Sequence, residues 1–146
     1  MNTKDYLTWE QIQTWSKELS AQIKNDCPDL TKATLVAVSR GGLIPAQLLS
    51  YNLDIRDIRL IKLISYDANN HRGETKNITT DNVEDGRYVY ILDDLADSGE
   101  TVRYLREMYP QARQCTLITK AGCKHKPDFT SVEYPDAAWL VFPWDE

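Results

Sequence analysis

The fold of this chain is decided by the stretch Tyr88-Val89-Tyr90-Ile91-Leu92-Asp93-Asp94-Leu95-Ala96-Asp97-Ser98-Gly99-Glu100-Thr101. Its first part, residues 88–92, is apolar or aromatic, which is typical of a strand buried on both faces of a parallel sheet. Four carboxylates follow within eight residues, with no basic residue between them. Neighbouring carboxylates repel one another unless a cation or a polyhydroxyl ligand holds them. The stretch therefore predicts a buried strand that runs into a ligand-binding loop.

The end of this loop has a different chemistry from its start. Small residues lead there into an expected helix over residues 99–109, and the free N–H groups and dipole of a helix N-terminus bind anions. A sugar phosphate, with hydroxyl groups at one end and a phosphate at the other, fits both parts of the loop. The simpler alternative is that Asp97 or Ser98 only caps the helix and that the other acids are solvated.

The rest of the chain alternates between helices and strands. Thr8 and Gln11 form a capping box for the first helix. The first helix has an apolar stripe from Trp9 to Ile23 and is stopped by residues 26–29, and further helices are expected over residues 43–53 and 99–109. The expected strands cover residues 34–38, 58–65, 88–92 and 113–119, with further strand and loop through 132–134 and 139–142. This order predicts an α/β fold with a mostly parallel central sheet flanked by helices on both faces, in a single domain over residues 1–146.

Ligands of such sheets bind beyond the carboxyl ends of the strands, which directs attention to the loops at 39–42, 67–86, 93–101 and 120–124. The second of these contains only three apolar residues, Ala68, Ile78 and Val83. A loop of that length inside a compact domain is typical of a lid, a functional loop or a disordered insert. We expect a long flexible loop that closes over the ligand.

Composition excludes several classes of function. The 146 residues carry 17 Lys and Arg against 22 Asp and Glu, a net charge of −5, so we expect no nucleic acid and no anionic membrane surface as a partner. No apolar run is long enough for an integral membrane segment, and no signal region opens the chain. Cys27, Cys115 and Cys123 lack the spacing of a zinc site or a disulfide framework. They predict half-buried or buried thiols in a cytoplasmic protein.

Other families that use acidic loops do not fit. An apolar strand ending in two acids is similar to the Walker B strand, but the chain contains no phosphate-binding loop of the G-x-x-x-x-G-K-[ST] type. An EF-hand needs acids at alternate positions with Gly at the sixth, and this spacing is different. A receiver domain carries its acidic pair on the first strand, and no G-x-G-x-x-G marks a dinucleotide site.

The stretch 91–101 closely resembles the PRPP-binding signature of the type I phosphoribosyltransferases: an apolar strand, two acids, two apolar residues and then Asp-Ser-Gly-x-Thr. Further segments are similar to the bacterial xanthine–guanine branch of this family, in the same order and at nearly the same intervals. They are Thr8-Trp9, residues 37–43, 65–67 and 106–110, Lys120, and Pro143-Trp144-Asp145. The resemblance covers essentially the whole chain and implies the type I fold, with a small hood and a flexible loop.

The resemblance assigns roles in PRPP binding. It implies that Asp93 and Asp94 hold the ribose hydroxyls and contact Mg²⁺. It implies a 5′-phosphate site made by Asp97, Ser98, Gly99, Glu100 and Thr101. It also implies a pyrophosphate site at Arg40 and Gly41, with Arg72 joining from the flexible loop. An Arg fork suits phosphate oxygens and Gly allows close approach of the backbone, whereas the simpler alternative for both arginines is a solvated surface position.

Roles toward the purine come from the same resemblance. Asp97 matches the acid near purine N7, a general acid/base and the expected catalytic residue. Lys120 matches the donor to the purine 6-oxo group, with an ordinary surface lysine as the alternative. Trp139 and Leu140 match the pair that packs on the purine, with a core tryptophan as the alternative. The apolar Val141 that follows leaves the choice among guanine, xanthine and hypoxanthine open.

The implied activity is Mg²⁺-dependent transfer of the 5-phosphoribosyl group from PRPP to a 6-oxopurine. The product would be the nucleoside 5′-monophosphate, with release of pyrophosphate, in purine salvage. The resemblance also implies a homo-oligomer, a dimer or a tetramer. The alternative is a regulatory protein that senses PRPP or a nucleotide on the same fold, because a fold does not fix a function.

Overall fold

The computed structural model describes residues 3–65 and 75–145, which form a six-stranded sheet, a separate pair of strands and three α-helices. The strands are β1 Lys4–Tyr6, β2 Thr34–Ser39, β3 Ile58–Ser65, β4 Thr75–Asn77, β5 Val89–Ala96, β6 Arg113–Lys120, β7 Phe129–Tyr134 and β8 Trp139–Val141. The sheet order is β4-β3-β2-β5-β6-β7, and all neighbours are parallel except β3 and β4. The prediction of a mostly parallel central sheet is confirmed.

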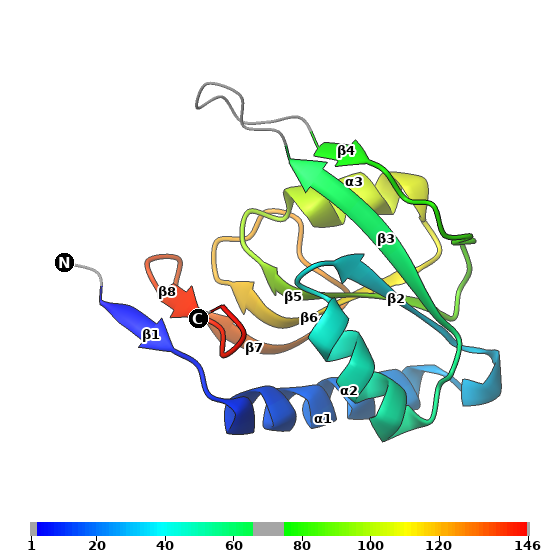
Figure 1. Ribbon diagram of the computed structural model, residues 1–146, viewed down its shortest axis with the longest axis horizontal. Helices are drawn as coiled ribbons and strands as arrows, with labels where there is room; N and C mark the ends of the chain where they lie inside the picture. The colour runs from blue at the N-terminus through cyan, green and yellow to red at the C-terminus, as the bar shows by residue number, and fades with distance from the viewer. Residues whose placement is uncertain (1–2, 66–74, 146) are drawn as a thin grey trace.

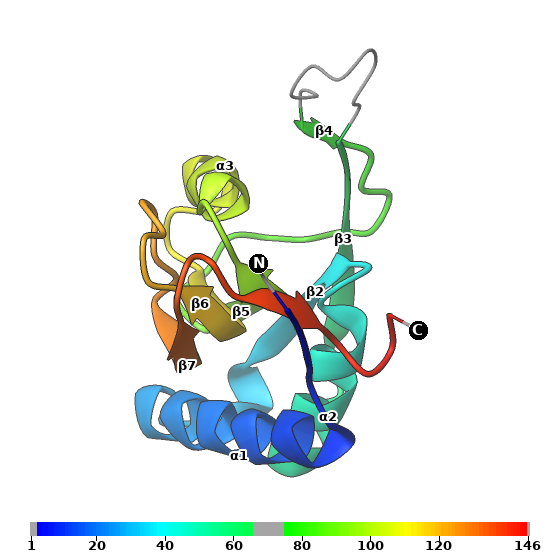
Figure 2. The same cartoon turned by 90° about the vertical axis from the view of Figure 1, so that its left-hand side faces the viewer.

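The helices are α1 Trp9–Asp26, α2 Leu43–Leu53 and α3 Glu100–Met108, with a short 3₁₀ turn at Leu30–Lys32. Helices α1 and α2 cover one face of the sheet and α3 covers the other, as Figures 1 and 2 show. The capping box at Thr8 and Gln11 is present at the start of α1. Trp9, the first residue of α1, is 55% exposed, and Met108, the last residue of α3, is 41% exposed.

Strand β5 is longer than predicted, which corrects the assignment of Asp93 and Asp94 to a loop. The strand continues to Ala96, because Asp93 and Leu95 stay in register with Thr116 and Ile118 of β6. Strand propensity is low for Asp, but the ladder to β6 overrides it here. The acid pair therefore lies within the sheet, and the loop proper begins at Asp97.

The segment expected to be a long loop contains a strand. Residues 75–77 form β4, which pairs antiparallel with the end of β3. Beyond it, polar side chains replace a strand partner along the edge of β3: Thr79 Oγ1 accepts from Lys62 N at 2.9 Å, and Asp81 Oδ2 accepts from Leu60 N at 3.0 Å. The segment thus has few apolar residues because its polar side chains accept hydrogen bonds from backbone N–H groups at the edge of β3. Of the flexible loop expected over residues 67–86, residues 67–74 lie outside the described residues, and residues 75–86 contain β4 and the polar segment that follows it.

The two ends of the chain meet in a small sheet that the sequence had only half predicted. Strand β8 was expected, but its parallel partner β1 was not. This pair is the small hood expected of the fold, and it lies beside the main sheet in Figure 1. An aromatic cluster ties it to α1: the Trp144 ring stacks on Phe142 at a centroid distance of 4.8 Å and lies 5.9 Å from Trp9.

The topology places the ligand site. From β2 the chain adds β3 toward one edge of the sheet. It then returns to the other side of β2 and adds β5, β6 and β7 toward the opposite edge, so the order of strand addition reverses between β2 and β5. Open α/β sheets bind ligands at the carboxyl ends of strands that flank such a switch point. These ends are residues 39–42 and 93–101. Among the three helices of the described chain, none has the length and hydropathy to span a membrane.

The last residue of α1 ties this helix to the strand that carries the acid pair. Asp26 receives two hydrogen bonds from Arg87, each of 2.8 Å, and one from the Tyr90 hydroxyl at 2.7 Å. Tyr90 is fully buried in β5. The hydrogen bonds from Arg87 lower the pKa of Asp26 from its ordinary value of 3.8 to about 2. The carboxylate is therefore more stable in the folded protein than in the unfolded chain.

We expect Asp26→Asn to lower the free energy of unfolding at pH 7 by about 1–2 kcal/mol. This is the usual contribution of a charge-assisted hydrogen bond, reduced because the Arg87 side chain is partly exposed to solvent. Because the pKa is depressed on folding, this stabilisation is present above pH 4 and is lost as the pH falls toward 2. Urea unfolding of both proteins across this range measures it. Asp54→Asn, in an exposed ion pair with Arg56, is the matched control and should change little. A difference between Asp26→Asn and wild type that is constant with pH would contradict this assignment.

Candidate functional site

Two adjacent carboxylates in β5 form the centre of the site. Asp93 Oδ1 accepts a hydrogen bond from Asp94 N at 2.9 Å. Burial, reinforced by the charge of Asp94, raises the pKa of Asp93 well above its ordinary value. Burial also raises the pKa of Asp94. Two carboxylates in a poorly solvated place resist ionisation unless a positive charge or several hydrogen-bond donors join them. The pair is therefore suited to a ligand that brings these groups.

Glycines opposite this pair make room for it. A Cβ atom on Gly41 would lie 2.6 Å from Asp94 Oδ1 and 2.8 Å from Asp93 Oδ1. A Cβ on Gly42 would lie 2.0 Å from the carbonyl oxygen of Leu92. Any side chain at either position would collide with β5. Gly42 is thus required by the close approach of two backbones at the switch point, and Gly41 leaves room for the carboxylates of the acid pair.

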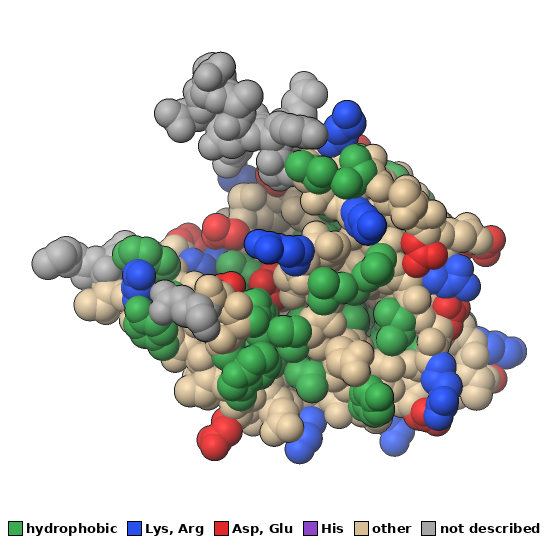
Figure 3. Space-filling view, in the orientation of Figure 1, with side chains coloured by type: hydrophobic (Ala, Val, Ile, Leu, Met, Phe, Trp, Pro, Cys, Tyr) green, Lys and Arg blue, Asp and Glu red, His purple; other side chains and the backbone are tan. Residues whose placement is uncertain are grey.

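Arg40, which precedes these glycines, is exposed and lines a hollow beside the acid pair. The hollow is lined by Arg40, Gly41, Leu43, Ile44, Asp94, Trp144 and Asp145. The peptide bond between Ser39 and Arg40 is cis. Figure 3 shows acidic and basic side chains gathered between the hood and the main sheet, beside hydrophobic ones. In such a hollow the arginine can bind an anionic ligand, and the carboxylate can bind a cation that accompanies this ligand.

The sequence reasoning gave no role to Trp144 and Asp145, which line the same hollow. Asp145 Oδ2 accepts a hydrogen bond from Phe142 N at 2.8 Å, and its charge contributes to the raised pKa of Asp94. In the sequence, the segment Pro143-Trp144-Asp145 is linked to the site only through the family resemblance. That resemblance was the available signal, because nothing in the local pattern places this segment beside β5.

The expected phosphate loop enters α3 through Gly99, whose φ of 90° is in the left-handed region. A Cβ on this residue would lie 2.5 Å from the carbonyl oxygen of His125. Ser98 is fixed from two sides: its carbonyl oxygen accepts from Lys124 N at 3.1 Å, and its Oγ accepts from Glu100 N at 3.3 Å. The loop therefore rests on the segment after β6, and only glycine fits at its turn.

The remaining residues of this loop have different surroundings. Asp97 is exposed, whereas Thr101 is half-buried, and both line a small cavity between β5 and α3 that Asp93 also reaches. The Glu100 carboxylate accepts hydrogen bonds from Arg103 on the helix surface, at 3.2 Å. Its backbone, and not its side chain, is therefore the part available to a phosphate.

Lys120 is not the surface lysine that the simpler alternative assumed. It ends β6, its side chain is buried, and 5% of the residue is exposed. Its Nζ donates to the carbonyl oxygens of Asp136 at 3.1 Å and Ala138 at 2.6 Å. An ammonium group has three N–H donors, so one donor remains for another acceptor. Lys120 lies one strand away from the end of β5, where Ala96 pairs with Thr119.

Trp139 and Leu140 begin β8, directly after the carbonyl that Lys120 holds. Trp139 is 52% exposed, which excludes the core tryptophan considered from the sequence. The Lys4 ammonium lies 4.9 Å from the centre of its ring. Leu140 is half-buried and in register with Asp5. The structure thus connects the expected purine-contacting strand to Lys120, while Arg72 lies outside the described residues.

Known proteins share this fold. The phosphoribosyl transferase domain family matches residues 2–146. The structure is similar to a purine phosphoribosyltransferase from Pyrococcus horikoshii, with a TM-score of 0.81 and 26% identity over 98% of this chain and 94% of that one. A xanthine-guanine-hypoxanthine phosphoribosyltransferase from Helicobacter pylori gives 0.78 and 26% over the same shares. A hypoxanthine-guanine phosphoribosyltransferase from Bacillus anthracis gives 0.76 and 27%, over 91% and 85%.

The burial of Asp93 predicts that the site destabilises the free protein. Because its pKa is raised on folding, the stability of the wild type should fall as the pH rises from about 4 through the folded pKa. Asp93→Asn keeps an acceptor for Asp94 N and removes the charge. We expect the free energy of unfolding of this variant to exceed that of the wild type by about 1–2 kcal/mol at pH 7, because substitutions that remove an unfavourable group from a functional site often stabilise a protein.

Urea unfolding between pH 4 and 8, without added ligand, measures this gain. Asp97→Asn removes an exposed acid three residues beyond Asp94 and serves as the matched control, with stability close to wild type. If Asp93→Asn is no more stable than the wild type at pH 7, the acid pair is not a strained site.

Proposed function

The chain belongs to the phosphoribosyl transferase domain family, and we propose that it transfers the 5-phosphoribosyl group of PRPP to a 6-oxopurine. The products would be a nucleoside 5′-monophosphate and pyrophosphate, in purine salvage. One observation carries this proposal: a single segment, residues 93–101, presents a half-buried acid pair and a helix N-terminus that is hydrogen-bonded to the loop after β6. The two ends of this segment match the hydroxyl and phosphate ends of a ribose 5-phosphate.

Mg²⁺ is the cofactor that this site fits. Asp93 and Asp94 offer hard oxygen donors, and burial makes them resist ionisation without a positive charge. Among the described residues, no group of three or more His, Cys, Asp or Glu could cage a metal ion. Mg²⁺ does not need such a cage, because it binds through one or two carboxylates together with substrate phosphates and water. When bound, it would neutralise the charge that develops on the departing pyrophosphate.

The chain's own residues would hold PRPP on both sides of the switch point. Asp93 and Asp94 would accept hydrogen bonds from the ribose hydroxyls. The backbone of Ser98 through Thr101 would donate to the 5′-phosphate at the N-terminus of α3. Arg40 and the backbone of Gly41 would hold the pyrophosphate, and we propose that Arg72 joins them when the loop closes. These contacts fix the sugar in position and stabilise the leaving group.

The purine would lie between the hood and the end of β6. Lys120 would use its remaining donor on the 6-oxo group, Trp139 would pack on the ring, and Leu140 would offer backbone groups. Asp97 would hold the proton at N7, as a general acid/base close to the reacting nitrogen. We propose guanine and xanthine ahead of hypoxanthine, a ranking that rests on the similarity to the xanthine–guanine branch.

Further features of the proposal concern the setting of the reaction. The free cysteines Cys27, Cys115 and Cys123 support a reducing compartment, and we propose the cytoplasm. We also propose a homodimer or homotetramer, which sedimentation analysis would measure. A regulator that only senses PRPP would need neither the buried donor at Lys120 nor an acid at Asp97, and the comparisons lend it no support.

Asp97→Asn should reduce turnover by about 10²–10⁴-fold, because it removes a positioned acid/base while the backbone cradle stays in place. The affinity for PRPP should stay within about twofold, since the exposed Asp97 carboxylate is not part of that cradle. Steady-state kinetics and calorimetry with PRPP and Mg²⁺ separate the two effects. A loss of turnover smaller than about fivefold would overturn the assignment of Asp97 as the acid/base, and α3 gives it no capping role because Gly99 is the N-cap.

The proposal is tested by a panel of purines assayed with PRPP and Mg²⁺, with pyrophosphate as the readout. We expect guanine to react and adenine to fail, because Lys120 has only donors and would face the adenine amino group donor against donor. A site built on such a hydrogen bond rejects the wrong analogue by about 10⁴-fold. Lys120→Ala should weaken guanine use and narrow the guanine-to-adenine ratio. Comparable rates with adenine and guanine in the wild type would overturn the assignment of Lys120.

A further inference from the structure

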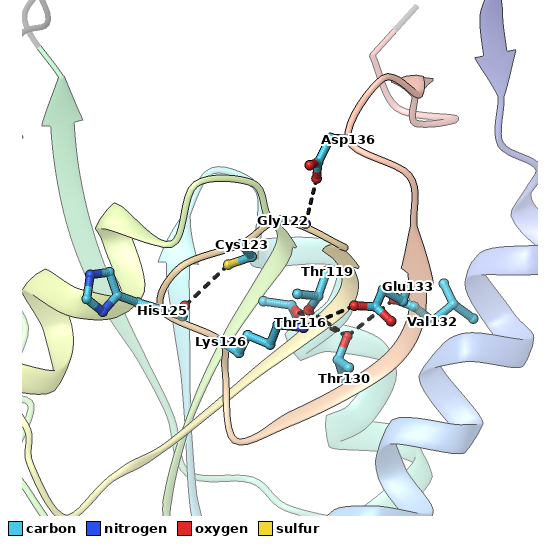
Figure 4. A network of polar contacts seen from close by, with 10 residues as sticks. All are labelled: Thr116, Thr119, Gly122, Cys123, His125, Lys126, Thr130, Val132, Glu133 and Asp136. Carbon is cyan, nitrogen blue, oxygen red and sulfur yellow. Dashed lines mark hydrogen bonds and ion pairs between the residues drawn. The ribbon is translucent and has the colours of Figure 1, made fainter.

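In the turn between β7 and β8, Asp136 is hydrogen-bonded to the end of β6 through both its backbone and its side chain. The carbonyl oxygens of Asp136 and Ala138 accept two of the three N–H groups of the Lys120 ammonium, at 3.1 and 2.6 Å. The carboxylate of the same Asp136 accepts a hydrogen bond from Gly122 N at 2.7 Å, as Figure 4 shows. Asp136 thus connects this turn to the end of β6 by its backbone and, independently, by its side chain.

The contact between Asp136 and Gly122 is tight enough to depend on glycine. A Cβ atom on Gly122 would lie 2.2 Å from Asp136 Oδ2 and 2.9 Å from Cγ. Gly122 is exposed, so the lack of a side chain is not required by burial in the core. The carboxylate of Asp136 takes up the space that a side chain would need. The two residues therefore form a fitted pair.

This pair decides where the free donor of Lys120 points. The lysine side chain is a flexible four-carbon chain, and its direction is set by what its ammonium binds. Among the described residues, the ion pairs do not include Lys120. The two carbonyls of the turn are what orient it, and the turn leads directly into Trp139. A shift of the turn would move the donor and the ring together.

We propose that Asp136 is a positioning residue for purine recognition. Its carboxylate fixes the turn, the turn orients Lys120 and the start of β8, and these in turn meet the purine. The inference rests on the proposed function, because it takes Lys120 as the partner of the 6-oxo group. Asp136 itself does not touch the substrate. The proposed PRPP-binding residues of the described chain lie after β2, at the end of β5 and at the start of α3, and none of them is hydrogen-bonded to Asp136. The hydrogen bond from Lys124 N to Ser98 does not involve Asp136 either, so PRPP binding should not respond to its substitution.

The test is a split between purine and PRPP binding. Asp136→Ala should raise the KM for guanine about tenfold, the scale of one lost charge-assisted hydrogen bond. The Kd for PRPP, measured by calorimetry with Mg²⁺, should stay within about twofold of wild type. Asp136→Asn keeps an oxygen that accepts from Gly122 N, so it should restore most of the guanine affinity. General destabilisation would not produce this pattern.

Asp128→Ala is the matched control. Asp128 Oδ2 accepts a hydrogen bond from Gln114 N at 2.7 Å, the same kind of bond at the other end of β6. Its loss should leave the KM for guanine unchanged. Gly122→Ala forces the Asp136 carboxylate aside and should raise the KM for guanine as Asp136→Ala does. Because the two changes break one contact, the double variant should be no worse than either single variant.

The outcomes separate this inference from the function on which it rests. A wild-type protein that converts no purine with PRPP overturns the proposed function, and this inference falls with it. If the wild type is active, three results overturn the inference alone. The first is a guanine KM in Asp136→Ala that equals the wild-type value. The second is a loss of PRPP affinity in Asp136→Ala as large as its loss of guanine affinity. The third is a double variant in which the effects of Gly122→Ala and Asp136→Ala on the guanine KM are additive.

Discussion

The site depends on two adjacent carboxylates that lie half-buried near the carboxyl end of the central strand β5. Asp93 and Asp94 lie in β5, where burial raises the pKa of both. The backbone after β2 passes so close to them that only glycine fits at Gly41. A fold that keeps unfavourable charges in such a place gives up stability for a site prepared to receive a cation and hydroxyl groups. The Gly-Gly turn leaves room for this arrangement, and the ladder to β6 that extends β5 to Ala96 keeps it within the sheet.

The short segment after β6 supports two parts of the site at once. Toward α3, Lys124 donates to Ser98 and the backbone of His125 packs against Gly99. Cys123 fills the space behind this turn with Ala96, and burial raises the pKa of its thiol, which suits a packing role. Toward the hood, the same segment carries the hydrogen bond from Gly122 to the turn that holds Lys120. The phosphate end and the purine end of the proposed site therefore contact one segment through different residues, Lys124 and Gly122.

The hood brings the ends of the described chain to the acid pair. Its two strands come from residues 4–6 and 139–141, and the stacked rings of Phe142 and Trp144 hold it against α1. This packing brings Asp145 into the hollow that Arg40 lines. A site assembled from β2, β5, β6 and β8 is held by elements that are far apart in the sequence, so its geometry depends on the whole domain.

The sequence by itself determined the fold class and the chemistry of residues 88–101, because apolar runs, turn residues and clustered acids are local signals. It also pointed to Arg40, Gly41 and Lys120, through a resemblance that spans the chain. Only the tertiary structure decided that β5 continues to Ala96, since the ladder to β6 outweighs the low strand propensity of Asp. The tertiary structure likewise decided the partner of β8, the polar edge along β3 and the place of Asp145. These features arise from contacts between distant segments, and no local pattern of residues encodes them.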